Sequence, residues 1–310
     1  MQWLDVVTQD PVPWLLDPEN PSVRLLTLRH IFGKPEEALA AERARLLDWK
    51  PIQSLRYHWN AVNFWGRAHD PYYGGAMGNF GTLYTLTQWG VPKFPEVEPA
   101  CENLLTRGRS SDGRFSPGES LAAPWLCYTG IALQIMSHFD LSNDLRVRSA
   151  QASLIQAILL RPELLDCPVA GGPCRAGLVK ALGALVNIPP SERSSEEDEA
   201  IDVLCERLLN APYDFEGQNA EWLMLGTPRY YDADLSELCH VIAQTPYRSH
   251  HRFHDLLGHL IDLQTPMGRW RKRRSTPAYS DERLSHPSRW VTFEATHTLM
   301  LVYGGNTYAS

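Results

Sequence analysis

The stretch 260-LIDLQTPMGRW-270 decides the fold, because a similar pattern lies far upstream. The segment 105-LTRGRSSDGRF-115 also has a leucine, a polar link, and then Gly-Arg followed by an aromatic residue. The two aromatic ends are separated by three units of about 52 residues, a length that suits a helical-hairpin repeat. Between them, the leucine pairs that open 164-LLDCPVAGG-172 and 208-LLNAPYDFEG-217 fall near the expected intervals. The sequence therefore predicts a degenerate repeat of helical hairpins.

Each turn of the repeat is followed by a segment that is apolar around much of its circumference, which indicates a buried inner helix. Amphipathic segments alternate with them and indicate outer helices with one wet face. A closed double ring satisfies this pattern, because every inner helix then has neighbours on both sides. The sequence predicts an all-α fold, an α/α toroid that spans 1–310 as a single domain. The expected inner helices are 74–90, 125–139, 172–186, 230–243 and 289–304, and 144–160 and 196–209 are expected outer helices.

Composition excludes several classes of function. The formal net charge is -7 and the basic residues are scattered apart from 269-RWRKRR-274, which argues against a nucleic-acid partner. The chain starts without a signal-peptide pattern, and no apolar stretch approaches the roughly 18 residues of a membrane span. The six cysteines have no C-x-x-C spacing, so neither a zinc knuckle nor a disulfide framework is indicated. We expect a cytoplasmic protein with no membrane insertion and no cofactor.

Several segments resemble one family in order and spacing. They are 11-PVPWLLDPENPSVRLLTLRHIFGKP-35, 127-CYTGIALQIMSHF-139, 228-PRYYDADLSEL-238, 264-QTPMGRW-270 and 287-PSRWVTFEATHTL-299. They are similar to the α/α-toroid group that includes squalene cyclases and protein-prenyltransferase β subunits. Within it, the chain most resembles a branch of small bacterial and fungal toroid proteins often labelled prenyltransferase- or squalene-cyclase-like.

A short motif within this resemblance concerns the fold rather than the chemistry. Gln264, Gly268 and Trp270 match the Q-x-x-x-G-x-W motif of squalene-type cyclases. In that family the Gln amide and the Trp ring tie neighbouring hairpins together, so the resemblance implies a structural role. The upstream copy has Arg109 at the Gln position and Phe115 at the Trp position.

The segment 232-DADLS-236 raises a catalytic hypothesis. In class II terpenoid cyclases, the middle Asp of a D-x-D-D motif protonates an alkene or epoxide. By resemblance Asp234 would be this acid and Asp232 its neighbour, but Leu235 replaces the third Asp. Equally, Asp232 could accept backbone N–H bonds as an N-cap, with Asp234 favoured by the positive end of the helix dipole. The sequence leaves both interpretations open.

Metal-dependent prenyl transfer is not supported. Protein prenyltransferases hold zinc with a D-x-C arrangement and a distant His, and this sequence has no D-x-C. In 247-YRSHHRFHDLLGH-259, His250 and His254 share one helix face, but the apolar residues fill the face that an outer helix buries. We therefore expect these histidines to point to solvent and expect no metal site.

In a toroid, the starts of the inner helices converge on one end of a central funnel. We expect Arg175 to pair there with Asp232 or Asp234, because a cation inside a helical ring needs an acidic partner. The other side chains expected to bind a substrate are Asn79, Phe80, Trp125, Tyr128, Tyr231 and Trp290, with Glu294 and His297 further down the last helix.

Such a funnel predicts a terpenoid-cyclase-like protein that binds an apolar or terpenoid-like small molecule. As an enzyme it would be an acid-initiated cyclase or isomerase whose aromatic side chains stabilise cationic intermediates. The alternative is a non-catalytic binding or scaffold protein whose funnel is plugged by side chains. A third possibility is unrelated chemistry on the same scaffold, since fold does not fix function.

Overall fold

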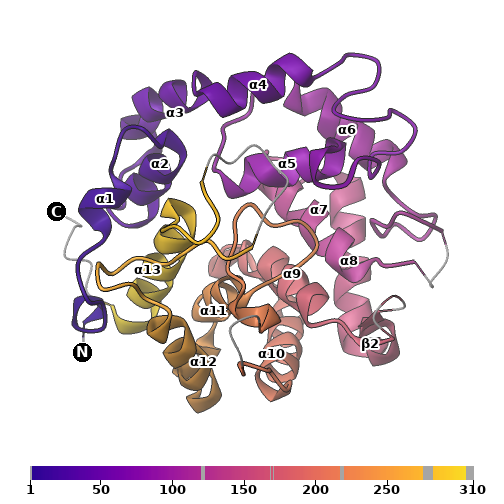
Figure 1. Ribbon diagram of the computed structural model, residues 1–310. Coiled ribbons are helices and arrows are strands. Elements are labelled where there is room, and N and C mark those ends of the chain that lie inside the picture. The colour runs from indigo at the N-terminus through magenta and orange to yellow at the C-terminus, as the bar shows by residue number, and fades with distance from the viewer. Residues whose placement is uncertain are drawn as a thin grey trace.

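The computed structural model describes residues 2–119, 123–167, 169, 171–216, 220–274 and 282–304. Within them the architecture is a ring of inner helices surrounded by outer helices, which confirms the predicted all-α toroid (Figure 1). The inner ring consists of α2 (Pro21–His30), α5 (Asn79–Gln88), α7 (Leu126–His138), α9 (Arg175–Val186), α11 (Leu235–Ala243) and α13 (Arg289–Tyr303).

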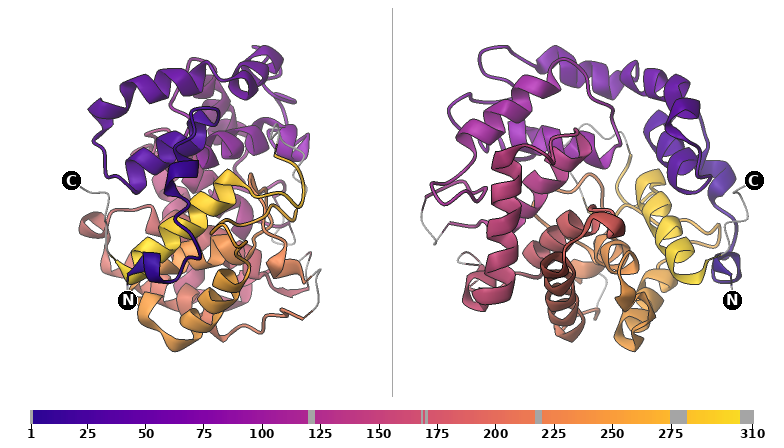
Figure 2. Two further views of the ribbon diagram at one scale, coloured as in Figure 1. Left: turned by 60° about the vertical axis from the view of Figure 1, so that its left-hand side comes forward. Right: turned by 180° about the vertical axis from the view of Figure 1, so that it is seen from behind.

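The inner helices pack against one another in chain order, from α5 to α7, α9, α11 and α13. Helix α13 then packs against α2, so the last inner helix lies beside the first (Figure 2). Helix α2 meets the end of α5 through the hydroxyl of Ser22, which donates to the carbonyl of Trp89 at 2.8 Å. These contacts close the inner ring. The sequence located five of its helices but did not assign α2 a place in it.

The outer helices cover the ring on the side away from its centre. They are α3 (Ala40–Leu47), α4 (Lys50–His58), α6 (Val97–Arg107), α8 (Leu145–Leu160), α10 (Ser195–Asn210) and α12 (His251–Asp262). The short α1 (Val12–Leu15) precedes α2, and β1 (Asp166–Cys167) pairs antiparallel with β2 (Gly172–Pro173) between α8 and α9. The 3-10 helices are Trp3–Asp5, Glu36–Leu39, Gly75–Met77, Pro162–Leu165, Pro190–Glu192, Glu221–Leu223 and Pro246–Ser249.

Burial distinguishes the two rings. In α9 every residue from Gly177 to Val186 is buried. In α12, by contrast, burial is confined to one stripe that includes Phe253 and Leu257, and His254 is exposed on the opposite side. This confirms the wet outer face expected for the histidine-rich segment. Within the described ranges, each helix is too short or too polar to cross a membrane.

The Q-x-x-x-G-x-W motif joins the end of the chain to its beginning. The side-chain amide of Gln264 donates to the carbonyl of Val6 at 3.1 Å, and its side-chain oxygen accepts from the backbone N–H of Thr8 at 3.1 Å. The indole of Trp270 is fully buried and donates to the carbonyl of Leu260 at 2.7 Å. The motif therefore anchors the turn between α12 and α13 to the N-terminal segment.

Gly268 lets these two segments approach closely. Its φ is +66°, and a Cβ atom there would lie 1.9 Å from the carbonyl oxygen of Gln9. A side chain would therefore be strained by the backbone conformation and would also collide with the N-terminal segment.

We predict that Gly268→Ala lowers the free energy of unfolding by at least about 2 kcal/mol, because the ring closure must deform. The matched control is Gly258→Ala on α12, where an added Cβ has no described heavy atom within 4 Å. The control should be stabilised by roughly 0.5–1 kcal/mol through its helix propensity. Urea denaturation measures both, and equal effects of the two substitutions would contradict the role assigned to Gly268.

Candidate functional site

A cavity of about 440 Å³ lies in the centre of the ring. Its lining comes from all six inner helices and from the loop before α11. On α2, α5, α7 and α9 the lining residues lie in the C-terminal halves, as with His30, Gln134 and Gly183. On α13 they extend from Trp290, near its start, to His297, just past its midpoint.

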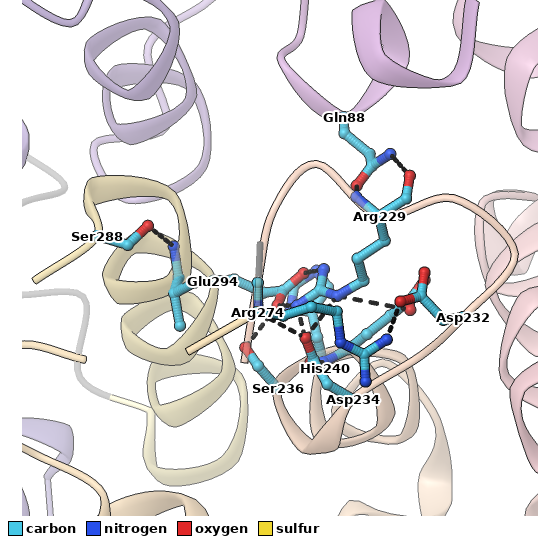
Figure 3. Close-up of polar contacts among 12 residues, drawn as sticks. Gln88, Arg229, Asp232, Asp234, Ser236, His240, Arg274, Ser288 and Glu294 are labelled. Atoms are coloured by element: carbon cyan, nitrogen blue, oxygen red, sulfur yellow. Dashed lines mark hydrogen bonds and ion pairs between the residues drawn. The ribbon is translucent and has the colours of Figure 1, made fainter. Parts of the chain in front are cut away.

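A buried arginine is the centre of the polar network beside this cavity. The Nε and Nη2 atoms of Arg229 donate to the two carboxylate oxygens of Asp234, each at 2.9 Å. Its Nη1 and Nη2 atoms donate to the two oxygens of Glu294 at 2.9 and 2.6 Å. Figure 3 shows the guanidinium between the two carboxylates. Burial alone would lower the pKa of Arg229, but the attraction of the carboxylates outweighs it and raises the pKa well above its usual value.

The backbone of Arg229 is held as firmly as its side chain. Its N–H donates to the Oε1 atom of Gln88 at 2.8 Å, and its carbonyl accepts from the Nε2 atom of the same amide at 2.8 Å (Figure 3). Gln88 is the last residue of α5. The paired bonds attach the loop before α11 to the opposite side of the ring.

A second buried cation, Lys180, lies next to Arg229 and its carboxylates. The Nζ atom of Lys180 on α9 donates to both carboxylate oxygens of Glu237 at 2.6 and 2.7 Å and to the hydroxyl of Tyr84 at 3.1 Å. Lys180 is fully buried, and this desolvation lowers its pKa although Glu237 acts in the opposite direction. Burial likewise raises the pKa of Tyr84 well above its usual value.

The position of Asp234 bears on the catalytic hypothesis. Asp234 is the N-cap of α11, and it accepts from the backbone N–H of Glu237 at 3.1 Å and of Gly226 at 2.9 Å. Both of its oxygens also bind Arg229, and it is not among the described residues that line the cavity. In this arrangement Asp234 is an ion-pair partner and a helix cap, whereas a proton donor would need a protonated carboxyl facing the ligand.

The prediction that Arg175 forms an ion pair with Asp232 or Asp234 is wrong. Its guanidinium donates to the carbonyl of Pro212, with its Cζ atom 5.4 Å from the ring centroid of Tyr213. Asp232 instead pairs with Arg274. Arg229, rather than Arg175, is the cation that holds Asp234. Arg229 lies only five residues before Asp234, so this nearby cation was the one signal in the sequence that could have predicted the pair. The chain must turn back on itself to bring the two side chains together.

Aromatic residues pack together at the N-terminal ends of α5 and α7, where the sequence predicts one end of the funnel. The rings of Phe80 and Tyr128 stack with centroids 5.4 Å apart, and Tyr72 meets both edge-on at 5.0 Å. Tyr230 packs edge-on against Phe80 at 5.9 Å. Large rings from the first turns of two neighbouring helices fill the narrow space there. Asn79 also lies at this end, where its amide donates to the carbonyl of Ala100 at 3.0 Å.

Of the remaining residues that the sequence predicts to bind a substrate, some line the cavity and others lie away from it. Trp290, Glu294 and His297 line the cavity. Trp290 is buried and stacks on Trp89 with centroids 5.4 Å apart. Trp125 is buried away from the cavity, beneath the guanidinium of Arg114 at 4.9 Å, and Tyr231 is 55% exposed. A binding role for each of these residues stays a prediction.

Histidines line the cavity near Glu294, and the sequence gave three of them no role there. The ring centroids of His240 and His297 are 5.1 Å apart, as are those of His297 and His30. His138 lines the cavity from α7. Burial lowers the pKa of His138, His240 and His297. In the described part of the chain, no group of three or more His, Cys, Asp or Glu residues is arranged to hold a metal ion.

Comparison with known proteins gives a weak structural likeness. No protein-family model matches the chain, and no curated protein matches it significantly. The solved structures similar to it include the type II terpene cyclase MstE from Scytonema in its apo form, with 14% identity over 93% of this chain and 97% of that chain and a TM-score of 0.32. A variant of that enzyme in complex with merosterolic acid A, its product, has 14% identity over 94% and 98% and the same TM-score. A likeness at this level carries no assignment of residue roles.

We predict that Asp234→Asn lowers the free energy of unfolding by roughly 2 kcal/mol or more, because an amide nitrogen replaces one of the two carboxylate oxygens that accept hydrogen bonds from the buried Arg229. The matched control is Asp232→Asn, since Asp232 and its partner Arg274 are partly exposed. The control should lose less than about 1 kcal/mol. Urea denaturation of the two variants tests this, and a stable Asp234→Asn protein would contradict the structural role.

The buried histidines predict a loss of stability in mild acid. Because burial lowers the pKa of His240 and His297 below the usual 6.5, the unfolded chain binds more protons than the folded one as the pH falls. Stability is fully present above about pH 6.5 and declines below it, by up to about 1.4 kcal/mol per pH unit for each histidine.

Urea denaturation between pH 7.5 and 4.5 in steps of about one unit measures this decline. His297→Phe should make it shallower. His254→Phe is the matched control, because that imidazole is exposed on α12. An identical pH dependence in the wild type and His297→Phe would show that the imidazole of His297 does not contribute.

Proposed function

We propose that this protein binds a small molecule with both apolar and hydrogen-bonding groups in the central cavity. The observation that carries the proposal is a cavity of about 440 Å³ lined from every inner helix of the ring. Sites for small molecules have volumes of roughly 300–1,000 Å³ and combine apolar walls with a few placed polar groups.

The lining favours an amphipathic ligand over a wholly apolar one. Trp290 and Phe293 supply aromatic surface, whereas Gln134, His240 and Gln244 supply polar groups. A hydrocarbon in this space would displace water from these groups without replacing its hydrogen bonds. A terpenoid that carries a polar group fits the same description, so the terpenoid-like ligand expected from the sequence remains part of the proposal in this narrower form.

Binding is better supported than acid-initiated cyclisation. Protonation of an alkene needs a strong acid that faces the substrate. Asp234 instead accepts two hydrogen bonds from Arg229, and the carboxylate that lines the cavity beside it, Glu294, is also bound to Arg229. The attraction of Arg229 outweighs desolvation and lowers the pKa of Glu294, which keeps this carboxyl ionised. The ionised pair supports a binding site more than a Brønsted acid.

The proposal predicts that a bulky residue at Gly183 weakens binding. Gly183 lines the cavity, and an added Cβ would lie 3.0 Å from the side-chain Nε2 of Gln134. The probes are geraniol, geranylamine and geranic acid, which share one carbon skeleton, together with benzyl alcohol, benzylamine and benzoate. Ligand-observed NMR and isothermal titration calorimetry measure their binding.

At least one probe should bind the wild type and bind Gly183→Leu at least about tenfold more weakly, since the leucine side chain occupies part of the cavity. Gly258→Leu is the matched control on outer helix α12, where the new side chain starts in open space, and it should bind as the wild type does. The proposal fails if no probe binds the wild type, or if Gly183→Leu binds all of them equally well.

A further inference from the structure

We propose that the ligand of the central cavity is an organic amine that binds as its ammonium cation. This inference rests on the proposed function and specifies the charge and the hydrogen-bonding character of the ligand. It follows from the charge balance of the buried network and from the hydrogen-bond acceptors that the cavity presents.

The buried charges beside the cavity do not balance. Asp234, Glu237 and Glu294 carry three negative charges, whereas Lys180 and Arg229 carry two positive charges, which leaves a net charge of about −1 in a poorly solvated place. A monovalent cation in the cavity would compensate this charge. An anionic ligand would increase the imbalance.

The two cations have little hydrogen-bonding capacity left for an anion. All three protons of the Lys180 ammonium are directed at Glu237 and Tyr84, and four of the five guanidinium N–H groups of Arg229 donate to carboxylates, which leaves one N–H on Nη1. Two carboxylate oxygens of the network, Oε1 of Glu294 and Oε2 of Glu237, each accept a single hydrogen bond from the described residues. In the described part of the chain, Oε1 of Glu294 accepts one hydrogen bond, from Arg229, although a carboxylate oxygen can accept two. The charged groups therefore offer acceptors more readily than donors.

The tautomer of His240 adds an acceptor. The hydroxyl of Thr298 donates its one proton to the carbonyl of Glu294 at 2.8 Å, since a carbonyl can only accept. The same hydroxyl must then accept from Nδ1 of His240 at 3.2 Å, so Nδ1 carries a proton. Because burial lowers the pKa of His240, the ring is neutral near pH 7 and its Nε2 is an acceptor. His240 lines the cavity.

The hydrogen bond of His138 also fixes its tautomer, which is the opposite of that of His240. Its Nε2 lies 2.8 Å from the carbonyl of Val91 and must donate to it, which leaves Nδ1 as the acceptor of the neutral ring. His297 also lines the cavity, and among the described residues it makes ring contacts but no hydrogen bond. At the cavity wall its imidazole therefore has no hydrogen-bond partner within the described ranges.

Two amides are oriented in the same sense. The Nε2 atom of Gln134 donates to the carbonyl of Lys180 at 3.0 Å, and Nε2 of Gln244 donates to the carbonyl of His240 at 3.1 Å. A carbonyl acceptor fixes which end of each amide faces it, so both Oε1 atoms remain as acceptors. Both glutamines line the cavity, from α7 and from the end of α11.

The aromatic lining suits the remainder of such a ligand. Trp290 and Phe293 present aromatic surface to the same cavity. An ammonium group is attracted to the face of an aromatic ring as well as to carboxylates, and the carbon skeleton of an amine packs against the same surface. A primary ammonium has three N–H donors and one positive charge, which matches the excess of acceptors and the residual negative charge.

The test compares probes that share a carbon skeleton and differ in the charge and type of their polar group. Geranylamine should bind the wild type at least about tenfold more tightly than geraniol or geranic acid in calorimetry at low salt, and benzylamine should show the same preference over benzyl alcohol and benzoate. Equal or tighter binding of the alcohol or the acid overturns the amine inference but leaves the proposed function standing. Absence of binding by every probe overturns both. An amine preference that persists in Gly183→Leu reflects adsorption outside the cavity and also overturns the inference.

A second test changes the charge at the cavity without touching the buried network. Asn187 lines the cavity at the end of α9, and its side chain is exposed. Asn187→Asp should strengthen geranylamine binding by about threefold or more, and Asn187→Lys should weaken it by a similar factor. Geraniol, which carries no charge, should respond much less than geranylamine in either variant. Amine affinities unchanged in both variants, or geraniol affinities that shift by the same factors, would contradict an ammonium in this cavity.

Discussion

The buried ion pairs of Arg229 are the constraint on which the rest of the site depends. This one side chain binds Asp234 at the start of α11 and Glu294 on α13, while its backbone is bound to Gln88 at the end of α5. Buried ion pairs contribute little net stability compared with apolar packing, because desolvation offsets their attraction. Removing the Arg229 side chain would leave Asp234 and Glu294 buried without this cation. The network therefore holds three inner helices in one relative arrangement, and that arrangement positions the cavity wall.

The two ends of the ring differ because different side chains occupy them. Around the first turns of α5 and α7, Phe80, Tyr128 and their neighbours pack ring against ring. Towards the other end, smaller and polar residues such as Gly183 and Gln134 line the cavity instead. The ring is closed through Gln264 and Gly268, which attach the turn before α13 to the N-terminal segment. Closure fixes α13 beside α2 and so completes the cavity wall.

Much of the fold was predictable from local pattern, whereas the site was largely not. The apolar segments located five inner helices because a helix buried on most sides has little polar surface. Helix α2 was missed as the sixth, since its neighbours in the ring are α13 and the end of α5, both distant in sequence. Arg175 was expected at the centre because it starts an inner helix, yet the folded chain places it against Tyr213. Trp290, Glu294 and His297, which the sequence predicts to bind a substrate, line the cavity, and their binding role stays a prediction.

The sequence by itself determined the helical class, the alternation of inner and outer helices, and the structural motif formed by Gln264, Gly268 and Trp270. These features depend on residue patterns within one helix or one turn, where spacing along the chain corresponds to spacing in space. Tertiary structure alone decided that Arg229 holds Asp234 and that the cavity lies away from the aromatic cluster. Both outcomes depend on which side chains from different helices meet at the centre of the ring. The spacing of residues along the chain does not encode the distances between those side chains.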